Sequence, residues 1–234
     1  MSALRKDERA AIAAVARHFS ASWEEDGGSP DAYITIAGKR IAAEIAAIER
    51  GRAERGDRAK PRLRFDKVVL RLIGGLQEAL REDVPEGQAL LLTATAPIRL
   101  PAKTAAVLEE KIRACLARRS AKVEVDETIH GNLVRVRLVK DISRRASKVI
   151  GFVHNSETDP EVLLHLAQSL LQEIGAAVDK PAPRSFTGER WLVIADGLAH
   201  IETYRQVHAQ LSIATEFKRI LMVLAGGRVE SLTG

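Results

Sequence analysis

Two acidic residues stand at the ends of one apolar stretch, "PDAYITIAGKRIAAE", which covers residues 30 to 44. Asp31 follows a proline, and Glu44 comes thirteen residues later. The letters "AYITIAG" alternate as a strand does, "GKR" is typical of a turn, and a second strand starts at Arg40. Neighbouring strands lie about 4.8 Å apart, so a hairpin can bring both carboxylates to one ion. The alternative is that both lie on a solvated rim.

A divalent metal is the ion that such a pair suits. Mg²⁺ prefers hard oxygen ligands and keeps several waters, so one or two carboxylates can hold it. The bound ion lowers the pKa of its water and orients a scissile phosphate, and a nearby cation assists. The stretch therefore predicts a Mg²⁺ (or Mn²⁺) site for cutting nucleic acid. Asp31 and Glu44 would be its ligands, with Arg40 or Lys39 near the phosphate.

The second half of this hairpin is ambiguous by composition, because alanine favours helix. A tight turn after a clear strand favours a second strand instead, in which Ile41, Ala43 and Ile45 alternate with Arg40 and Glu44. The strand register decides the chemistry, since a slip of one residue would turn Glu44 to the other face.

The elements around the hairpin predict an α/β protein. Apolar residues at helical spacing predict helices at 4–22, 65–82 and 103–119, of which 65–82 has the longest apolar stripe. The segment 88–96 is apolar on both faces, which predicts a buried strand. A helix between two strands implies a parallel pair, and hence a mixed sheet flanked by helices.

The second half of the chain continues this pattern without a linker. Strands are expected at 121–128, 132–140 and 147–153, then a helix with Asp159 as N-cap and Gly175 past its end. A strand at "RWLVIAD", a helix at 199–213 and a strand with a turn at Gly226-Gly227 complete it. We expect a core in residues 1–120 and a β/α extension in 121–234, as two domains or as parts of one.

The hairpin and the order of elements resemble the PD-(D/E)xK nuclease superfamily, which has the restriction-endonuclease-like fold. In that family's core, a helix, three strands, a helix and a strand follow one another. An aspartate after a proline and a nearby acidic residue bind the metal. Pro30-Asp31 and Glu44 match these positions, and the resemblance covers roughly residues 5 to 100. It implies that the helix at 65–82 and the strand at 88–96 complete the core.

One residue departs from the family pattern. The lysine expected two residues after the glutamate is Ala46. Arg40 or Lys39 could replace it, although an arginine stays protonated and would clamp a phosphate rather than activate a water. Two alternatives to the nuclease hypothesis follow: an inactive relative that binds nucleic acid or a protein, and an uncharacterised α/β interaction module in which the match is accidental.

Net charge and its distribution point to DNA or RNA as a partner. The chain carries a formal charge of +5 and has a pI of about 9.5. Residues 50–64 read "RGRAERGDRAKPRLR". This segment is either a surface loop or a phosphate-binding segment. Aromatic residues make up only 4% of the chain, which argues against a stacking platform for single strands. The seven expected phosphate contacts are Arg50, Arg52, Arg55, Arg58, Lys60, Arg62 and Arg64.

Other chemistry-bearing residues have simpler interpretations. Cys115 is the only cysteine, which excludes an internal disulfide and favours a reducing, cytoplasmic setting. No apolar run approaches the length of a membrane span. The sequence is compatible with a homo-oligomer. Glu8 is either a metal ligand or a favourable first-turn charge. Trp191 is expected in the core, Asp196 has no visible partner, and the six histidines show no zinc spacing.

Overall fold

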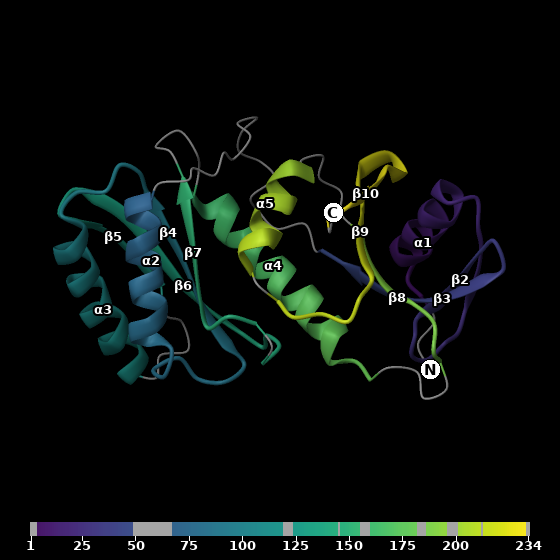
Figure 1. Cartoon of the computed structure of the whole chain (residues 1–234), viewed down its shortest axis with the longest axis horizontal. Helices are drawn as coiled ribbons and strands as arrows, with labels where there is room; N and C mark the ends of the chain where they lie inside the picture. The colour runs from purple at the N-terminus through teal and green to yellow at the C-terminus, as the bar shows by residue number, and fades with distance from the viewer. Residues whose placement is uncertain are drawn as a thin grey trace. The chain divides into compact units, whose positions relative to one another are not determined.

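The computed structural model describes residues 4–48, 67–118, 124–144, 146–154, 160–181, 186–195, 201–211 and 213–232 (Figure 1). The architecture is mixed α/β, with two mixed sheets that are flanked by helices. The chain forms two compact units, and each sheet belongs to one of them. The predicted fold class is therefore confirmed at this level.

The first unit comprises Met1–Arg50, Gln172–Arg205 and Ala214–Gly234. Its sheet has the strand order β1-β2-β3-β8-β9-β10, in which β3, β8 and β9 are parallel and the other neighbours are antiparallel. The elements are α1 (Lys6–His18), β1 (Ser22–Glu25), β2 (Ala32–Ile36), β3 (Lys39–Ala47), β8 (Arg190–Ala195), β9 (Arg219–Val223), the 3-10 turn η2 (Ala225–Gly227) and β10 (Val229–Ser231).

The second unit comprises Gly51–Leu171 and Gln206–Ile213. Its sheet has the order β5-β6-β4-β7, and helices α2 and α3 pack on one face of it (Figure 1). Two helices, α4 (Pro160–Asp179) and α5 (Ile201–Leu211), are divided between the units. The remaining elements are α2 (Lys67–Leu80), β4 (Gln88–Thr95), α3 (Pro101–Ala117), β5 (Glu124–Ile129), β6 (Asn132–Lys140) and β7 (Val149–His154).

The core of the first unit lies between α1 and one face of its sheet. Ile34, Ile41 and Ile45 point to this face with Trp191, which is buried as expected. Ala37 and Gly38 have φ values of 48° and 79°, as a two-residue hairpin turn requires. The alanines of β3 suit a strand that has neighbours on both sides and is buried along most of its length. Pairing has therefore overridden their helix propensity.

The prediction that the strand at 88–96 completes the sheet of the hairpin was wrong. The strand at 88–96 forms β4, which pairs with β6 and β7 in the second unit, and β3 pairs with β8 instead. Residue types predict a strand but not its partner, and here the parallel neighbour of β3 follows more than 140 residues later. The first unit is built from three separate stretches, so a division at residue 120 does not describe the units.

Candidate functional site

The strand register places Asp31 and Glu44 across from each other. Ala32 pairs with Ala43 in the antiparallel ladder of β2 and β3, so Asp31, directly before β2, continues that register opposite Glu44. An Asp31 Oδ2 atom also accepts a hydrogen bond of 2.8 Å from the backbone N–H of Ile45. This bond fixes the aspartate against the strand that carries the glutamate. The hairpin therefore brings together the two carboxylates that the sequence predicts as a pair.

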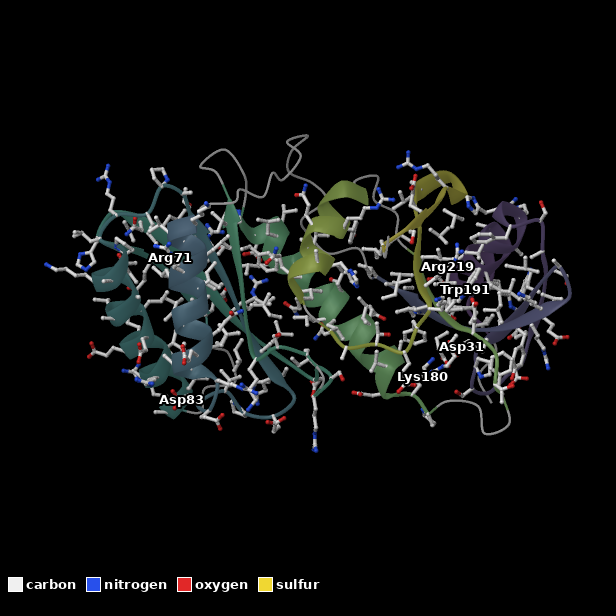
Figure 2. All side chains as sticks on the ribbon, in the orientation of Figure 1. Asp31, Arg71, Asp83, Lys180, Trp191 and Arg219 are labelled. Carbon is white, nitrogen blue, oxygen red and sulfur yellow. The ribbon has the colours of Figure 1, made fainter. Side chains whose placement is uncertain are left out.

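A lysine from the end of α4 lies between these carboxylates. Lys180 Nζ is 2.9 Å from Asp31 Oδ2 and 2.9 Å from Glu44 Oε2. The two oxygens are thus no more than twice that distance apart. Asp31 and Lys180 are labelled in Figure 2. Sequence reasoning missed Lys180 because it directly follows a helix 136 residues beyond Glu44. No spacing motif connects them, and only the fold could have revealed the contact.

Glu44 is almost fully buried, with 1% of its side chain exposed. Its Oε1 atom lies 3.7 Å from Arg190 Nη2, at the start of β8, and 3.5 Å from the Ser29 hydroxyl. That hydroxyl also donates to the Pro181 carbonyl at 3.0 Å. Burial raises the pKa of Glu44 above its usual range, although Lys180 and Arg190 act in the opposite direction. The glutamate therefore depends on these cations to stay charged.

Lys180 is held as a cation. Burial alone would lower its pKa, but the hydrogen bonds and negative charges of Glu44 and Asp31 outweigh burial and raise the pKa of Lys180. Its side chain is 40% exposed, whereas that of Arg190 is 11% exposed. Two cations of different accessibility therefore face the same buried carboxylate.

The structure does not bring the other predicted cations to this pair. Arg40 lies on the same strand face as Glu44, but its guanidinium pairs with Glu24 and stacks at 3.6 Å on the Tyr33 ring. Lys39 is exposed at the first position of β3, one residue before Arg40 and thus on the opposite face. The basic residues expected to contact phosphate all lie between 50 and 64, outside the described residues.

Glu8, the candidate in the first helix, does not join the pair. Its carboxylate accepts a 2.7 Å hydrogen bond from the Arg5 backbone N–H and forms a capping box at the start of α1. This is the expected first-turn role. Glu24 and Glu25 lie in β1. Cys115 packs against the core of the second unit, and Asp196 lies outside the described residues.

Within the part of the chain that the structure describes, no group of three or more His, Cys, Asp or Glu side chains is arranged to hold a metal. The Asp31–Glu44 pair supplies two carboxylates, which suffices for an ion that keeps several waters. None of the helices in those ranges is long and apolar enough to cross a membrane.

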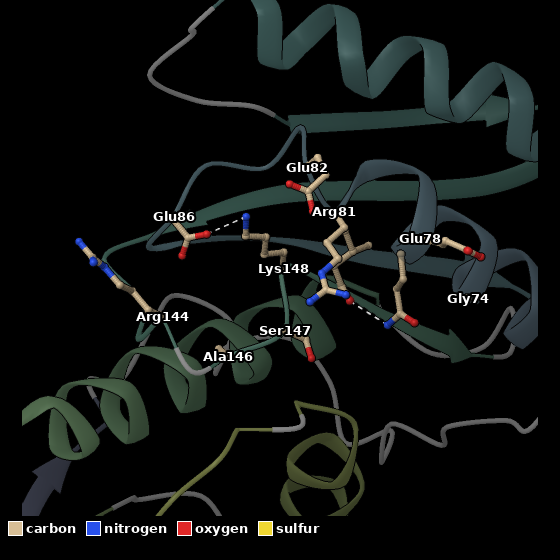
Figure 3. Close-up of a pocket in the computed structure, with 11 residues that line it drawn as sticks. Gly74, Glu78, Arg81, Glu82, Glu86, Arg144, Ala146, Ser147 and Lys148 are labelled. Carbon is tan, nitrogen blue, oxygen red and sulfur yellow. Dashed lines mark hydrogen bonds and ion pairs between the residues drawn. The ribbon is translucent and has the colours of Figure 1, made fainter.

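A polar hollow lies in the second unit (Figure 3). Its charges are balanced, and one pair is closed, since Lys148 Nζ lies 2.8 Å from Glu86. A hollow without a net charge does not indicate a class of ligand. The acidic side chains that line it are Glu78, Glu82 and Glu86, and the basic ones are Arg81, Arg144 and Lys148.

Comparisons of the chain with protein-family models, with curated proteins and with solved structures gave no match.

Proposed function

We propose that the chain is a Mg²⁺- or Mn²⁺-dependent phosphodiesterase that acts on nucleic acid through Asp31 and Glu44. The observation that carries this proposal is the meeting of these two carboxylates on one face of a sheet, beside Lys180. Mg²⁺ sites that serve phosphate chemistry use one or two carboxylates together with substrate phosphate oxygens. An ammonium group beside the two carboxylates suits such chemistry, because it can stabilise the negative charge that develops on the phosphate.

The order of elements in the first unit supports a restriction-endonuclease-like core. Helix α1, strands β1, β2 and β3, the end of helix α4 and strand β8 follow one another, and β3 and β8 are parallel. This is the order that the resemblance implies. The helix and last strand of this proposed core are α4 and β8 rather than the segments at 65–82 and 88–96. Elements α2 to β7 would then be an insertion.

Two oxygens of the right type are available for the metal. Asp31 and Glu44 would hold the ion, which would supply an activated water and stabilise the charge that develops on the phosphate. Both donors are hard oxygens, as Mg²⁺ and Mn²⁺ prefer. Glu44 stays aligned because it is buried on a central strand, and Asp31 because the Ile45 N–H holds it.

Lys180 would take the place of the lysine that is missing at position 46. Its raised pKa keeps the ammonium protonated, so it serves as a cation for a phosphate oxygen rather than as a base. A half-exposed side chain at the end of a helix can reach outward to a substrate. Arg40, which pairs with Glu24, is not needed for this role.

A second candidate function is that of an inactive relative that binds nucleic acid or a protein partner. It is favoured by the closed ion pair, because Lys180 already hydrogen-bonds both carboxylates. In that case the cluster stabilises the first unit, and binding depends on other surfaces.

Cleavage assays decide between the two. Plasmid DNA, single-stranded DNA and RNA would be incubated with the protein and Mg²⁺ or Mn²⁺, for wild type, Asp31→Asn and Glu44→Gln. The matched control is Asp83→Asn, a half-exposed carboxylate that pairs with Arg113 at 2.8 Å in the second unit. We expect a loss of about 100-fold or more in the two site variants, because metal stabilisation provides several kcal/mol, and no loss in the control.

The alternative gives a different pattern. If wild type retards nucleic acid in a gel but cleaves none of the three substrates with either metal, the catalytic proposal is contradicted. Equal cleavage by wild type and both site variants would show that any activity resides elsewhere or comes from a contaminant.

A further inference from the structure

The cation at the centre of the site is part of the chain itself. Lys180 Nζ makes equal contacts of 2.9 Å with Asp31 and Glu44, so it lies where the two carboxylates converge. Any divalent ion that is shared by the same oxygens needs the same position. Mg²⁺ binds oxygen at about 2.0–2.1 Å, closer than the ammonium does. The two cations therefore exclude each other.

The two cations beside Glu44 differ in their freedom to leave. Arg190 is nearly buried and lies against the Phe217 ring, with its Cζ atom 5.0 Å from the ring centroid. Its buried Nε and Nη2 groups have no hydrogen-bond partner among the described residues. Lys180 is 40% exposed and stands just beyond the last residue of α4. Lys180 can move into water, whereas Arg190 stays and keeps a positive charge beside the buried Glu44.

We propose that Lys180 is a built-in competitor for the metal position: it closes the Asp31–Glu44 pair until a divalent cation displaces it. This inference rests on the proposed metal site. It makes metal binding weaker than the two carboxylates alone would allow, because two charge-assisted hydrogen bonds must first be broken. Displacement also frees one ammonium group at the edge of the site.

A phosphodiester is the chemistry that would accept the freed ammonium. Because the released cation has lost both carboxylate partners, an anionic phosphate oxygen beside the site would stabilise the displaced state. Metal and phosphodiester should therefore each strengthen the binding of the other, and this coupling should be reciprocal. Lys180 adds to the coupling that a direct contact between metal and phosphate provides.

Calorimetry of Mn²⁺ binding to the full chain tests the competition. The variants are Lys180→Met and, as matched control, Lys148→Met, whose ammonium lies 2.8 Å from Glu86 in the second unit. We expect Lys180→Met to bind Mn²⁺ about tenfold more tightly than wild type, as when a charge-assisted hydrogen bond no longer has to be broken. Dimethyl phosphate should tighten Mn²⁺ binding to wild type by a larger factor than to Lys180→Met.

A second measurement uses wild type alone, in case Lys180→Met does not fold. Acetic anhydride labels accessible amines, and mass spectrometry gives the extent for each lysine. Labelling of Lys180 should rise when Mn²⁺ is added, while that of Lys148 stays constant.

The outcomes separate this inference from the proposed function. Tighter Mn²⁺ binding by Lys180→Met, or increased labelling of Lys180, supports the competition. If wild type binds Mn²⁺ and Lys180→Met binds it equally or more weakly, with unchanged labelling, Lys180 is no competitor and the metal site stands. If neither protein binds millimolar Mn²⁺, the proposed function is overturned together with the inference.

Discussion

The dependence of buried Glu44 on Lys180 leads to a measurable coupling in stability. Lys180→Met removes the ammonium and leaves Glu44, 1% exposed, with Arg190 Nη2 at 3.7 Å as its remaining cation. Removal of one partner from a buried ion pair costs about 3–5 kcal/mol. Lys180 is 40% exposed, so water screens part of this interaction. We therefore expect a loss of about 1–3 kcal/mol in the free energy of unfolding.

Glu44→Gln should suppress most of that loss. The amide keeps the shape of the side chain and removes the charge, so this variant alone should lose only about 1 kcal/mol. Once the glutamate is neutral, Lys180→Met no longer leaves a charge buried without its main partner. The double variant should therefore be more stable than the sum of the single losses predicts, by about 1–2 kcal/mol.

Urea denaturation followed by tryptophan fluorescence is the suitable assay. Both tryptophans, Trp23 and Trp191, belong to the first unit, so the signal reports the unit that contains the ion pair. This matters because a chain with two units need not unfold in one step. If the double variant loses the sum of the two single losses, Glu44 does not rely on Lys180.

The same cycle has a defined pH dependence. Burial raises the pKa of Glu44, so protonation of the folded state is favoured at low pH and removes the buried charge. With Lys180 gone, the hydrogen bond that opposes this rise is lost as well. The destabilisation by Lys180→Met should therefore be smaller at pH 5 than at pH 8. A larger loss at pH 5 would contradict this assignment of the charge.

Two further predictions concern the second unit. Gly151→Ala should destabilise it by about 1–3 kcal/mol, because a Cβ at this position would lie 2.5 Å from Ile73 Cγ2. The control Gly75→Ala, whose Cβ meets open space, should cause no such loss. Thermal melts followed by circular dichroism would show the difference, and equal melting temperatures for the two variants would contradict the packing. Burial lowers the pKa of His208, so the unfolded state takes up a proton more readily than the folded state as the pH falls. Wild type should therefore lose more stability than His208→Gln between pH 7 and pH 5. Equal losses in the two proteins, measured by the same melts, would contradict this prediction.

Local patterns of the chain predicted much of the first unit. The Pro30-Asp31 to Glu44 hairpin has the expected strands and facing residues, although its turn lies at Ala37-Gly38 rather than at 38–40; alternation and a two-residue turn fix the register without help from the rest of the chain. Trp191 is buried as its place in an apolar strand predicts. These features depend on contacts between residues that are near in sequence or on simple burial.

The parts that could not be predicted depend on distant pairing. Nothing in the composition of β3 or β8 states that they are neighbours, since several strands of this chain are apolar enough to fill either place. Lys180 directly follows α4, and its contact with the hairpin depends on the same distant pairing. Arg40 was expected beside Glu44 on the correct face, but Glu24 on β1 binds it instead.

The first unit is formed by three separate stretches of the sequence, which leads to a last prediction on a fragment of residues 1–120. This fragment contains α1 and β1 to β3 but lacks β8, β9 and β10, which form the other half of the first sheet. Ile34, Ile41 and Ile45 would keep α1 but lose Trp191 and the other core residues of β8, β9 and β10, and β3 would become an edge strand with an unpaired backbone. We expect Trp23 fluorescence of the fragment to show no cooperative transition in urea, whereas the full chain shows one. A cooperative transition in the fragment would mean that the first 50 residues fold without β8, and that Lys180 reaches a hairpin that is already formed.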